Sequence, residues 1–547
     1  MTAREGAGSD RGDRSVDYLA RRLREAGCRF AFGMPGGEVV ALVDALDRAG
    51  IHFILAKHEN AAGFMAEGVY HRTGAPGILV TTLGPGATNG INVVANAEQD
   101  RIPLIVLTGC VDADDALTYT HQVLDHQALF RPITRATFRL TADGADIIAD
   151  KAVAIAMRGR PGPVHIDIPI AVAEATVEIG KLRRFAKESP VAPAEGEALD
   201  RARSWLAQAR RPLLIAGLDV TSHRAEQALR DFVEAHRMPF VTTYKAKGVI
   251  REDHPLCLGG AGLSPLADRH LLPLVKTADL LLCVGYDPIE MRTGWREIWD
   301  PGKQRVIDIG AAANTHYMHQ AGLNFVCDVG AGLRALSMGV KSNAAWIPAE
   351  LGNAQRALAG AFPTDESWGP AAVVDEARKS LPANAIVTVD SGAHRILLSQ
   401  MWKSFEPRSL LQSTGLCTMG CALPLAIGAK IAEPDRPVVA FCGDAGFLMV
   451  AGELATMAEL QLPAIVVVFV DASLALIEIK QRGRQLANVG VDFGVHDVGA
   501  IGRAFGGNGH MVHSRPQLAA AIEDGLASAR FTVIGCAIDR RAYDGRL

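Results

Sequence analysis

The fold is decided by the stretch Val438-Val439-Ala440-Phe441-Cys442-Gly443-Asp444-Ala445-Gly446, an apolar run that ends in a glycine-flanked acid. A second apolar run, residues 464–470, ends at another acid, Asp471. Between the two runs, the apolar residues of 450–460 recur at helical spacing, so the whole segment predicts strand, helix and strand. Both aspartates are therefore expected at the ends of strands.

Asp444 and Asp471 are expected to meet at the carboxyl edge of a parallel sheet, because consecutive parallel strands are usually neighbours. Two carboxylates at one place repel each other unless a cation lies between them. The turn at 443–446 also lets backbone N–H groups approach an anion at a helix N-terminus. A diphosphate bridged by Mg²⁺ fits, since Mg²⁺ prefers one or two carboxylates plus phosphate oxygens. From the residues alone, the two acids could equally be helix caps.

Composition sets limits on the rest of the molecule. A chain of 547 residues, 49% of them hydrophobic, is too long for one core and predicts two to four domains. Its net charge of −4 provides no basic field for nucleic acid or an anionic membrane. Nine cysteines without a C-x-x-C pair favour reduced thiols. Residues 1–14 are polar and predict a disordered segment rather than a signal peptide or anchor, so we expect a cytoplasmic protein without membrane spans.

Three blocks alternate short apolar runs with helical patterns, which is typical of parallel α/β units. We predict an α/β protein with three doubly wound parallel-sheet domains at 15–178, 199–340 and 369–547, joined by linkers at 179–198 and 341–368. In the first two blocks, the expected strands are 30–32, 53–56, 77–81, 103–107, 164–168, 212–216, 240–243, 280–284 and 306–309.

The segment from Gly443 to Asp471 resembles the thiamin-diphosphate signature, which opens with Gly-Asp-Gly and closes with Asn 27 positions after the aspartate, the spacing found here. Ala445 replaces a glycine of that signature but is small enough for the same turn. Asp471 replaces the asparagine and offers the same oxygen with one more negative charge. The order of the three blocks is also that of the thiamin-diphosphate-dependent decarboxylases and carboligases, so the resemblance covers nearly the whole chain.

The resemblance implies a pyrimidine-binding domain, a middle domain and a domain that binds diphosphate and Mg²⁺ through Asp444, Asp471 and Ser473. Glu59, which follows a predicted strand, matches the glutamate that hydrogen-bonds the cofactor's pyrimidine ring and so promotes proton removal from the thiazolium. Without the resemblance, Glu59 could simply be a favourable charge at a helix N-terminus. The other residues matched to cofactor binding are Gly392, Ala393, His394, Leu416, Met419, Gly443, Ala445 and Gly446.

Two of these matched residues have plain alternatives. His394 follows Asp390-Ser391-Gly392-Ala393, which resembles the family's second diphosphate loop, but it could equally be a surface histidine. Met419 matches the apolar side chain that wedges between the two cofactor rings, although a methionine beside a helix is more often ordinary core packing.

Finer resemblance concerns the substrate. Residues 120–134 strongly resemble the catabolic acetolactate synthases, with Thr-His-Gln, Asp, Ala-Leu-Phe and Pro-Ile-Thr at the same spacing, and 284–290 and 490–494 match them too. This implies condensation of two 2-oxo acids with loss of CO₂, so that two pyruvates give 2-acetolactate. Gln122 is the candidate to hydrogen-bond the substrate's carboxylate or hydroxyl, with His121 second. Both could instead cap a helix or face solvent.

Two departures fall where the acceptor would be chosen. Leu476 stands where acetolactate synthases usually have Met, and Lys480 where the catabolic ones have Gln. The Lys480 cation could select another anionic substrate or extend into solvent. The alternative function is therefore another thiamin-diphosphate 2-oxo acid decarboxylase or aldehyde carboligase. A more remote one is a non-catalytic cofactor-binding homologue, which would not need Glu59.

The middle block argues against FAD, because Tyr286-Asp287-Pro288 replaces the arginine-bearing sequence of the flavin-containing biosynthetic enzymes and no G-x-G-x-x-G loop is present. The resemblance also implies a homodimer or homotetramer. In this family Glu59 and the diphosphate site that faces it belong to different subunits, which places the active sites at a subunit interface.

Overall fold

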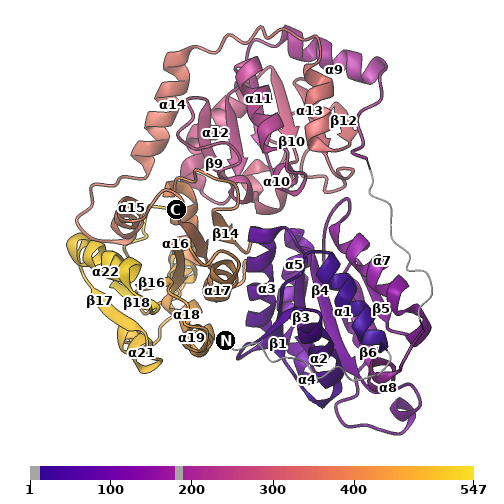
Figure 1. Cartoon of the computed structure of the whole chain (residues 1–547). Coiled ribbons are helices and arrows are strands. Elements are labelled where there is room, and N and C mark those ends of the chain that lie inside the picture. Colours follow the sequence, from indigo (N-terminus) through magenta and orange to yellow (C-terminus); the bar gives the residue numbers. More distant parts are fainter. Residues whose placement is uncertain (1–12, 179–188) are drawn as a thin grey trace. The chain divides into compact units, whose positions relative to one another are not determined.

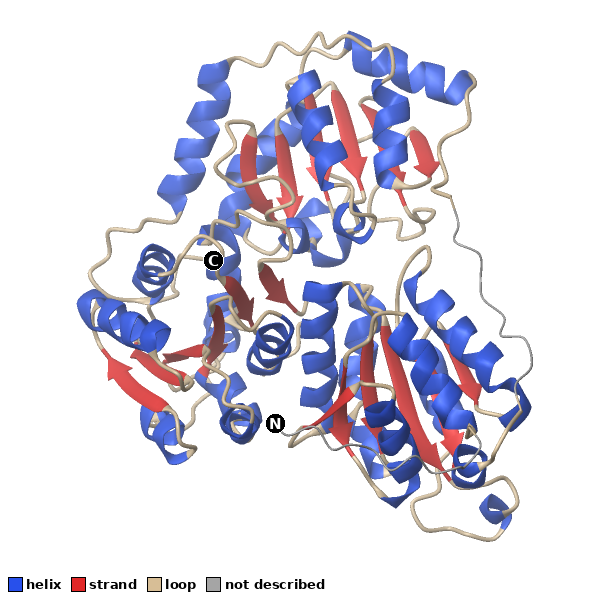
Figure 2. Cartoon of the chain, viewed as in Figure 1, coloured by secondary structure: helices blue, strands red, loops and turns tan. Residues whose placement is uncertain are grey.

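The computed structural model describes residues 13–178 and 189–547 and divides the chain into two compact units, with the boundary between residues 187 and 188. The predicted disordered segment 1–14 lies outside the described residues except for its last two, and the linker 179–198 is described only from residue 189. Figure 1 shows the elements of both units, and Figure 2 shows the alternation of helices and strands along the chain. Three six-stranded, entirely parallel sheets confirm the predicted fold class.

The first unit contains one sheet in the order β2-β1-β3-β4-β6-β5. Its strands are β1 (Phe30–Met34), β2 (His52–Leu55), β3 (Gly77–Thr81), β4 (Leu104–Cys110), β5 (Ala136–Arg139) and β6 (Val164–Pro169). Its helices are α1 (Ser15–Glu25), α2 (Val40–Arg48), α3 (Glu59–Thr73), α4 (Pro85–Asn89), α5 (Ile91–Asp100), α6 (His126–Phe130), α7 (Ala145–Met157) and α8 (Ile170–Glu174). The helices α1, α2 and α7 bury their apolar sides against one face of the sheet, with α3 and α5 on the other (Figure 1).

The second unit contains two sheets, the first in the order β12-β11-β10-β7-β8-β9. Its strands are β7 (Pro212–Ala216), β8 (Phe240–Thr243), β9 (Cys257–Ala261), β10 (Leu280–Val284), β11 (Arg305–Gly310) and β12 (Leu323–Val326). Its helices are α9 (Glu197–Gln208), α10 (Asp219–Ser222), α11 (Glu226–His236), α12 (Pro265–Thr277), α13 (Val329–Ser337) and α14 (Pro348–Ala361). The helix α14 lies within residues 341–368, which were predicted as a linker.

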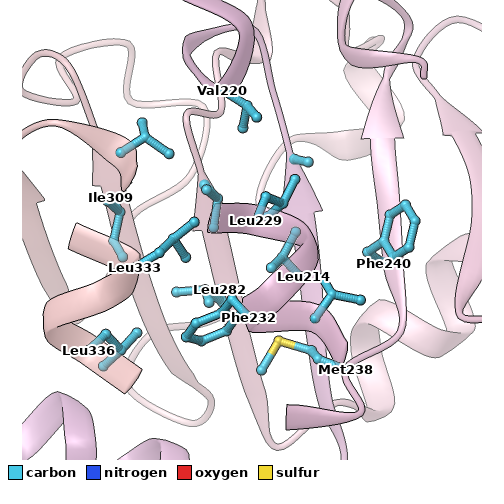
Figure 3. Packing of buried hydrophobic residues seen from close by; sticks show 14 of the residues in the cluster. Leu214, Val220, Leu229, Phe232, Met238, Phe240, Leu282, Ile309, Leu333 and Leu336 are labelled. Carbon is cyan, nitrogen blue, oxygen red and sulfur yellow. The ribbon is translucent and has the colours of Figure 1, made fainter. Parts of the chain in front are cut away.

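The alternation of side chains along these strands builds a core on each face of the sheet. Leu214 and Leu282 face the cluster formed by α9, α11 and α13, whereas Leu213 and Leu281 face the one that contains α12. Figure 3 shows the first cluster, where Phe232 of α11 and Leu333 of α13 pack over the sheet. Such continuous apolar runs are typical of parallel strands buried on both sides.

The other sheet of this unit has the order β14-β13-β15-β16-β18-β17. Its strands are β13 (Ile386–Val389), β14 (Leu410–Gln412), β15 (Val438–Gly443), β16 (Ile465–Val470), β17 (Asn508–Val512) and β18 (Thr532–Ala537). Its helices are α15 (Pro370–Ser380), α16 (Ala393–Met401), α17 (Ala422–Ala432), α18 (Asp444–Val450), α19 (Glu453–Glu459), α20 (Ala475–Gly483), α21 (Val498–Ala504) and α22 (Arg515–Ala527). The neighbours β13, β15 and β16 form its centre, and their carboxyl ends carry the candidate site.

Candidate active site

Three acids follow three adjacent strands at one edge of the last sheet. Asp390 comes directly after β13, Asp444 after β15 and Asp471 after β16. The strands β15 and β16 pair in parallel, with Gly443 opposite Phe469, so Asp444 and Asp471 lie at neighbouring strand ends. This is the arrangement that the strand–helix–strand pattern predicts. Sequence reasoning quoted Asp390 only as part of a loop and missed it as a member of this group.

The Asp444 carboxylate is buried and fully engaged with the backbone. Its Oδ2 accepts hydrogen bonds from the N–H groups of Asp471 at 3.1 Å and Ala472 at 2.7 Å, and its Oδ1 accepts one from Ala445 at 2.9 Å. Burial raises the pKa of Asp444 despite these bonds. The backbone of one strand end thus fixes the carboxylate of the other.

The pKa of the Asp471 carboxyl is raised, in part by the acid beside it. Burial, followed by the charge of Asp444, raises its pKa to about 7. Its Oδ1 accepts a hydrogen bond from the Ser473 N–H at 3.0 Å, so the side chain is held over the loop that follows β16. A divalent cation would remove the repulsion between the two acids.

The donor set fits Mg²⁺ with a diphosphate. Among residues 13–178 and 189–547, no group of three or more His, Cys, Asp or Glu side chains could by itself hold a metal. Zinc requires such a group, whereas Mg²⁺ takes one or two carboxylates and fills its other positions with water and phosphate oxygens. Asp444 and Asp471, with Ser473 beside them, meet the second requirement.

Asp390 connects three loops of the site. Its Oδ1 lies 2.7 Å from His394 Nε2 and accepts the Gly443 N–H at 3.2 Å, and its Oδ2 accepts the Gly420 N–H at 2.8 Å. His394 is 5% exposed and stacks on Phe469, so it is not a surface histidine. The structure therefore rules out that alternative and places His394 inside the site.

Most of the predicted cofactor residues line one pocket with an empty volume of about 700 Å³. The predicted residues that line it are Gly392, Ala393, His394, Met419, Gly443, Asp444, Ala445, Gly446, Asp471, Ser473 and Leu476. Leu416 and Lys480 do not line it, and the Lys480 side chain on α20 is exposed. Tyr543, which sequence reasoning missed because its segment has no recognisable pattern, lines it as well.

In the first unit, Glu59 begins α3 after the short turn that follows β2, and it is 4% exposed. Its Oε2 accepts a hydrogen bond from Asn89 Nδ2 at 3.0 Å. The short helix α4, which carries Asn89, approaches closely, since a Cβ on its Gly86 would lie 3.2 Å from Glu59 Oε1. Glu59 is thus a buried carboxylate oriented by an amide, with its other oxygen near Gly86 of α4.

Gln122 and His121 are exposed and line another pocket of the first unit, together with Glu38 and Tyr119. Neither of them caps a helix, because the cap of α6 is Asp125, whose side chain accepts the Ala128 N–H.

The segment that carries Gln122 is fixed against the loop at Gly84. Gln122 has a positive φ of 58°, and a Cβ on Gly84 would lie 2.7 Å from its carbonyl oxygen. His126 then accepts the Gly84 N–H through Nε2 at 3.1 Å and bonds Asp167 through Nδ1 at 2.9 Å. Hydrogen bonds from His126, His165 and Thr108 hold the pKa of Asp167 below its usual range despite burial. Gln122 therefore contacts the residue that caps α4, the helix that brings Asn89 to Glu59.

Three family models match the chain. They are described as the N-terminal TPP binding domain, the central domain and the C-terminal TPP binding domain of thiamine pyrophosphate enzymes, at residues 14–129, 199–336 and 390–536. The acetolactate synthase of Bacillus subtilis (strain 168) is 30% identical over 96% of this chain and 93% of its own length. The acetolactate synthase isozyme 1 large subunit of Escherichia coli (strain K12) is 32% identical over 85% and 83%, and the catabolic acetolactate synthase of Raoultella terrigena 29% over 94% and 93%.

Proposed function

Because this chain belongs to the thiamine pyrophosphate enzyme family, we propose that it is an acetolactate synthase, which condenses two molecules of pyruvate to 2-acetolactate with loss of CO₂. The enzymatic nature of the chain and its cofactor, thiamin diphosphate, follow from the matched domains. The observation that carries the choice of reaction is the similarity to acetolactate synthases along 96% of the chain. The stretch 120–134 supports the catabolic type.

The chain's own residues divide the work between binding and proton handling. Asp444 and Asp471, with Ser473, would hold Mg²⁺ and through it the diphosphate. When bound, thiamin diphosphate supplies the carbon nucleophile and electron sink that let a 2-oxo acid lose CO₂. Met419, on the pocket wall, would contact the bound cofactor.

Proton handling is proposed for Glu59. Its carboxylate would hold a proton at the cofactor's pyrimidine ring, and the Asn89 amide at 3.0 Å would keep it in the orientation needed for that transfer. Gln122, and after it His121, would hydrogen-bond the carboxylate or hydroxyl of the substrate, since both face a pocket rather than capping a helix.

A second candidate function rests on Leu476. It lines the cofactor pocket where acetolactate synthases usually have Met, and this substitution would change the shape of the wall that it forms. Lys480 is exposed and outside that pocket, which gives it less influence on the substrate. The second function is a 2-oxo acid decarboxylase or aldehyde carboligase with a substrate other than pyruvate.

We also propose that the enzyme works as a homo-oligomer without FAD. In the middle sheet, the strand order changes direction between β7 and β10, the place where such folds bind dinucleotides. Asp219 begins the helix α10 just after β7, and its charge would oppose a pyrophosphate there. Light scattering would give the oligomeric state, and the visible spectrum of the purified protein would reveal bound flavin.

The test is a substrate panel. The protein is freed of cofactor, then incubated with thiamin diphosphate, Mg²⁺ and one 2-oxo acid at a time, while CO₂ and the products are measured. We expect pyruvate to give one CO₂ and one acetolactate per two molecules consumed. CO₂ without acetolactate would support the second function, and Leu476→Met should then move the products toward acetolactate. No turnover of any acid would point to a non-catalytic homologue.

Among residues 13–178 and 189–547, none of the helices has both the length and the apolar character required to cross a bilayer.

A further inference from the structure

Tyr543 is the unexplained residue of the cofactor pocket. It lies in the segment 539–547 that follows β18, and its side chain is 1% exposed. The ring belongs to an apolar cluster with Ala393 and Ala475, which flank the two loops of the diphosphate site. The same side chain lines the pocket together with Asp444 and Asp471. Segment 539–547 therefore contributes a wall of that pocket.

The hydroxyl of Tyr543 has no hydrogen-bond partner within the described protein. A buried phenol almost always has one, because removing its O–H from water without compensation is costly. A tyrosine hydroxyl is protonated at neutral pH, so it can donate a hydrogen bond. The orphaned donor thus lies beside the acids that would hold the metal.

Ion pairs fix the segment that carries Tyr543 to the metal site. Arg540 contacts Glu478 at 2.8 Å, and Asp544 pairs with Arg482. Glu478 in turn accepts the Ser473 hydroxyl at 2.6 Å. A single carboxylate therefore links the loop after β16 to the segment of Tyr543, and the position of the phenol is set by the same loop that carries Asp471.

We propose that Tyr543 is a cofactor-binding residue whose hydroxyl donates a hydrogen bond to a phosphate oxygen of the diphosphate held at Asp444 and Asp471. The inference rests on the proposed diphosphate site and adds a donor to it from a segment outside the family's signature. A phosphate oxygen is a suitable acceptor at this position. The carboxylates of the site repel an anion, so a diphosphate binds there only with Mg²⁺ to neutralise the charge and with neutral donors, such as a phenol, to hydrogen-bond its oxygens.

The test measures cofactor binding rather than turnover. Calorimetric titration of cofactor-free protein with thiamin diphosphate in excess Mg²⁺ gives the Kd for the wild type and for Tyr543→Phe, which keeps the ring and removes the hydroxyl. We expect Tyr543→Phe to raise the Kd about tenfold or more, the usual effect of losing a hydrogen bond to a charged group. The Tm of the cofactor-free variant should not fall, since the hydroxyl has no protein partner to lose.

Tyr244→Phe is the matched control. Tyr244 is equally buried, but its hydroxyl accepts Gln400 Nε2 at 2.6 Å and the Leu263 N–H at 3.2 Å. Its removal should lower the Tm of the cofactor-free protein and leave the Kd of thiamin diphosphate unchanged.

The outcomes separate this inference from the proposed function. If Tyr543→Phe binds thiamin diphosphate with the wild-type Kd, the inference is overturned and the proposed function stays intact. A raised KM for the 2-oxo acid at that unchanged Kd would place the hydroxyl at the substrate instead. A drop in the Tm of cofactor-free Tyr543→Phe would show a protein partner for the hydroxyl and also overturn it. Failure of the wild type to bind thiamin diphosphate would instead overturn the proposed diphosphate site itself.

Discussion

Asp444 and Asp471 follow paired strands, yet their carboxylates have different partners within the described residues: Asp444 accepts the Asp471 N–H at 3.1 Å, whereas Asp471 Oδ1 accepts the Ser473 N–H at 3.0 Å. Both oxygens of Asp444 serve as backbone acceptors, since Oδ1 also binds the Ala445 N–H. An amide has only one acceptor oxygen. Asparagine can therefore replace Asp471 but cannot reproduce Asp444.

This asymmetry predicts opposite results for two similar variants. Asp444→Asn should weaken Mg²⁺-dependent binding of thiamin diphosphate by about tenfold or more, because it removes a charge and turns an NH₂ group toward backbone N–H donors. Asp471→Asn should bind within a few-fold of the wild type. Calorimetric titrations with and without EDTA measure both, and EDTA should abolish the difference between them. Equal losses in the two variants would contradict the asymmetry.

Gly446 and its neighbour Ala445 form a second matched pair. A Cβ on Gly446 would lie 1.9 Å from Asp390 Oδ2, the oxygen that accepts the Gly420 N–H. Gly446→Ala should therefore displace Asp390, cost about 1–3 kcal/mol of stability and weaken cofactor binding. Ala445→Gly should cost less than about 1 kcal/mol and keep the cofactor affinity. Thermal melts and titrations check both, and an unimpaired Gly446→Ala variant would show that the loop can relax.

The sequence predicts the central strands because each is a continuous apolar run. The expected strand at 212–216 is β7, Pro212–Ala216, and the one at 280–284 is β10. In the first two sheets, the strands β5, β9 and β12 are not predicted, and all three lie at edges. In the third sheet, β14 and β17 at the edges and the interior β18 are not predicted either. An edge strand is covered on fewer sides, so its sequence need not be a continuous apolar run. The residues of β5, for example, are all only partly buried.

The same reasoning explains which site residues the sequence reveals. Asp444 and Asp471 are visible because each directly follows a buried strand. The contacts of Asp390 with Gly420 and Gly443 join segments that are distant in sequence, so only the tertiary structure shows them. Tyr543 lies in a segment without periodicity and is likewise visible only in the fold.

Asp308 in β11 predicts a pH effect on stability that is separate from catalysis. Burial, followed by the nearby charge of Asp219, raises its pKa to about 7, while Asn314 donates a partly compensating hydrogen bond. An unfolded aspartate titrates near about 4, so between these values the folded state binds more protons. Stability should therefore fall as the pH rises through this window.

Asp308→Asn should remove that loss. Its Tm should equal that of the wild type at about pH 4 and exceed it by several degrees at about pH 8. Asp300→Asn is the control, because a backbone hydrogen bond from Gly302 lowers the pKa of that exposed carboxylate. Asp300→Asn should give no gain at either pH. A pH-independent difference between Asp308→Asn and the wild type would show that Asp308 does not titrate in this range.

Glu59 and Glu67 provide the sharpest test of catalysis, because they are structurally alike. Both are buried in α3, and each accepts a hydrogen bond from an asparagine amide, Glu59 from Asn89 at 3.0 Å and Glu67 from Asn96 at 3.1 Å. They differ in their other oxygen. Glu67 Oε1 lies 3.3 Å from His71 Nε2, whereas Glu59 Oε1 lies near Gly86, where a Cβ would come within 3.2 Å of it. Glu67 is therefore satisfied within the protein, and Glu59 keeps an oxygen for the cofactor.

Glutamine at each position should separate a catalytic from a structural carboxylate. Glu59→Gln should lower kcat by about 10²–10⁴-fold with pyruvate, the range for loss of an acid–base group, while the Tm and the Kd of thiamin diphosphate stay near the wild-type values. Glu67→Gln should lower the Tm and leave kcat unchanged. The glutamine amide has one acceptor oxygen, whereas the two oxygens of Glu67 contact Asn96 and His71. Steady-state kinetics, melts and titrations on the three proteins decide the matter. Wild-type turnover by Glu59→Gln would rule out the proton-transfer role, because glutamine can still accept the hydrogen bond from Asn89 but cannot gain or lose a proton.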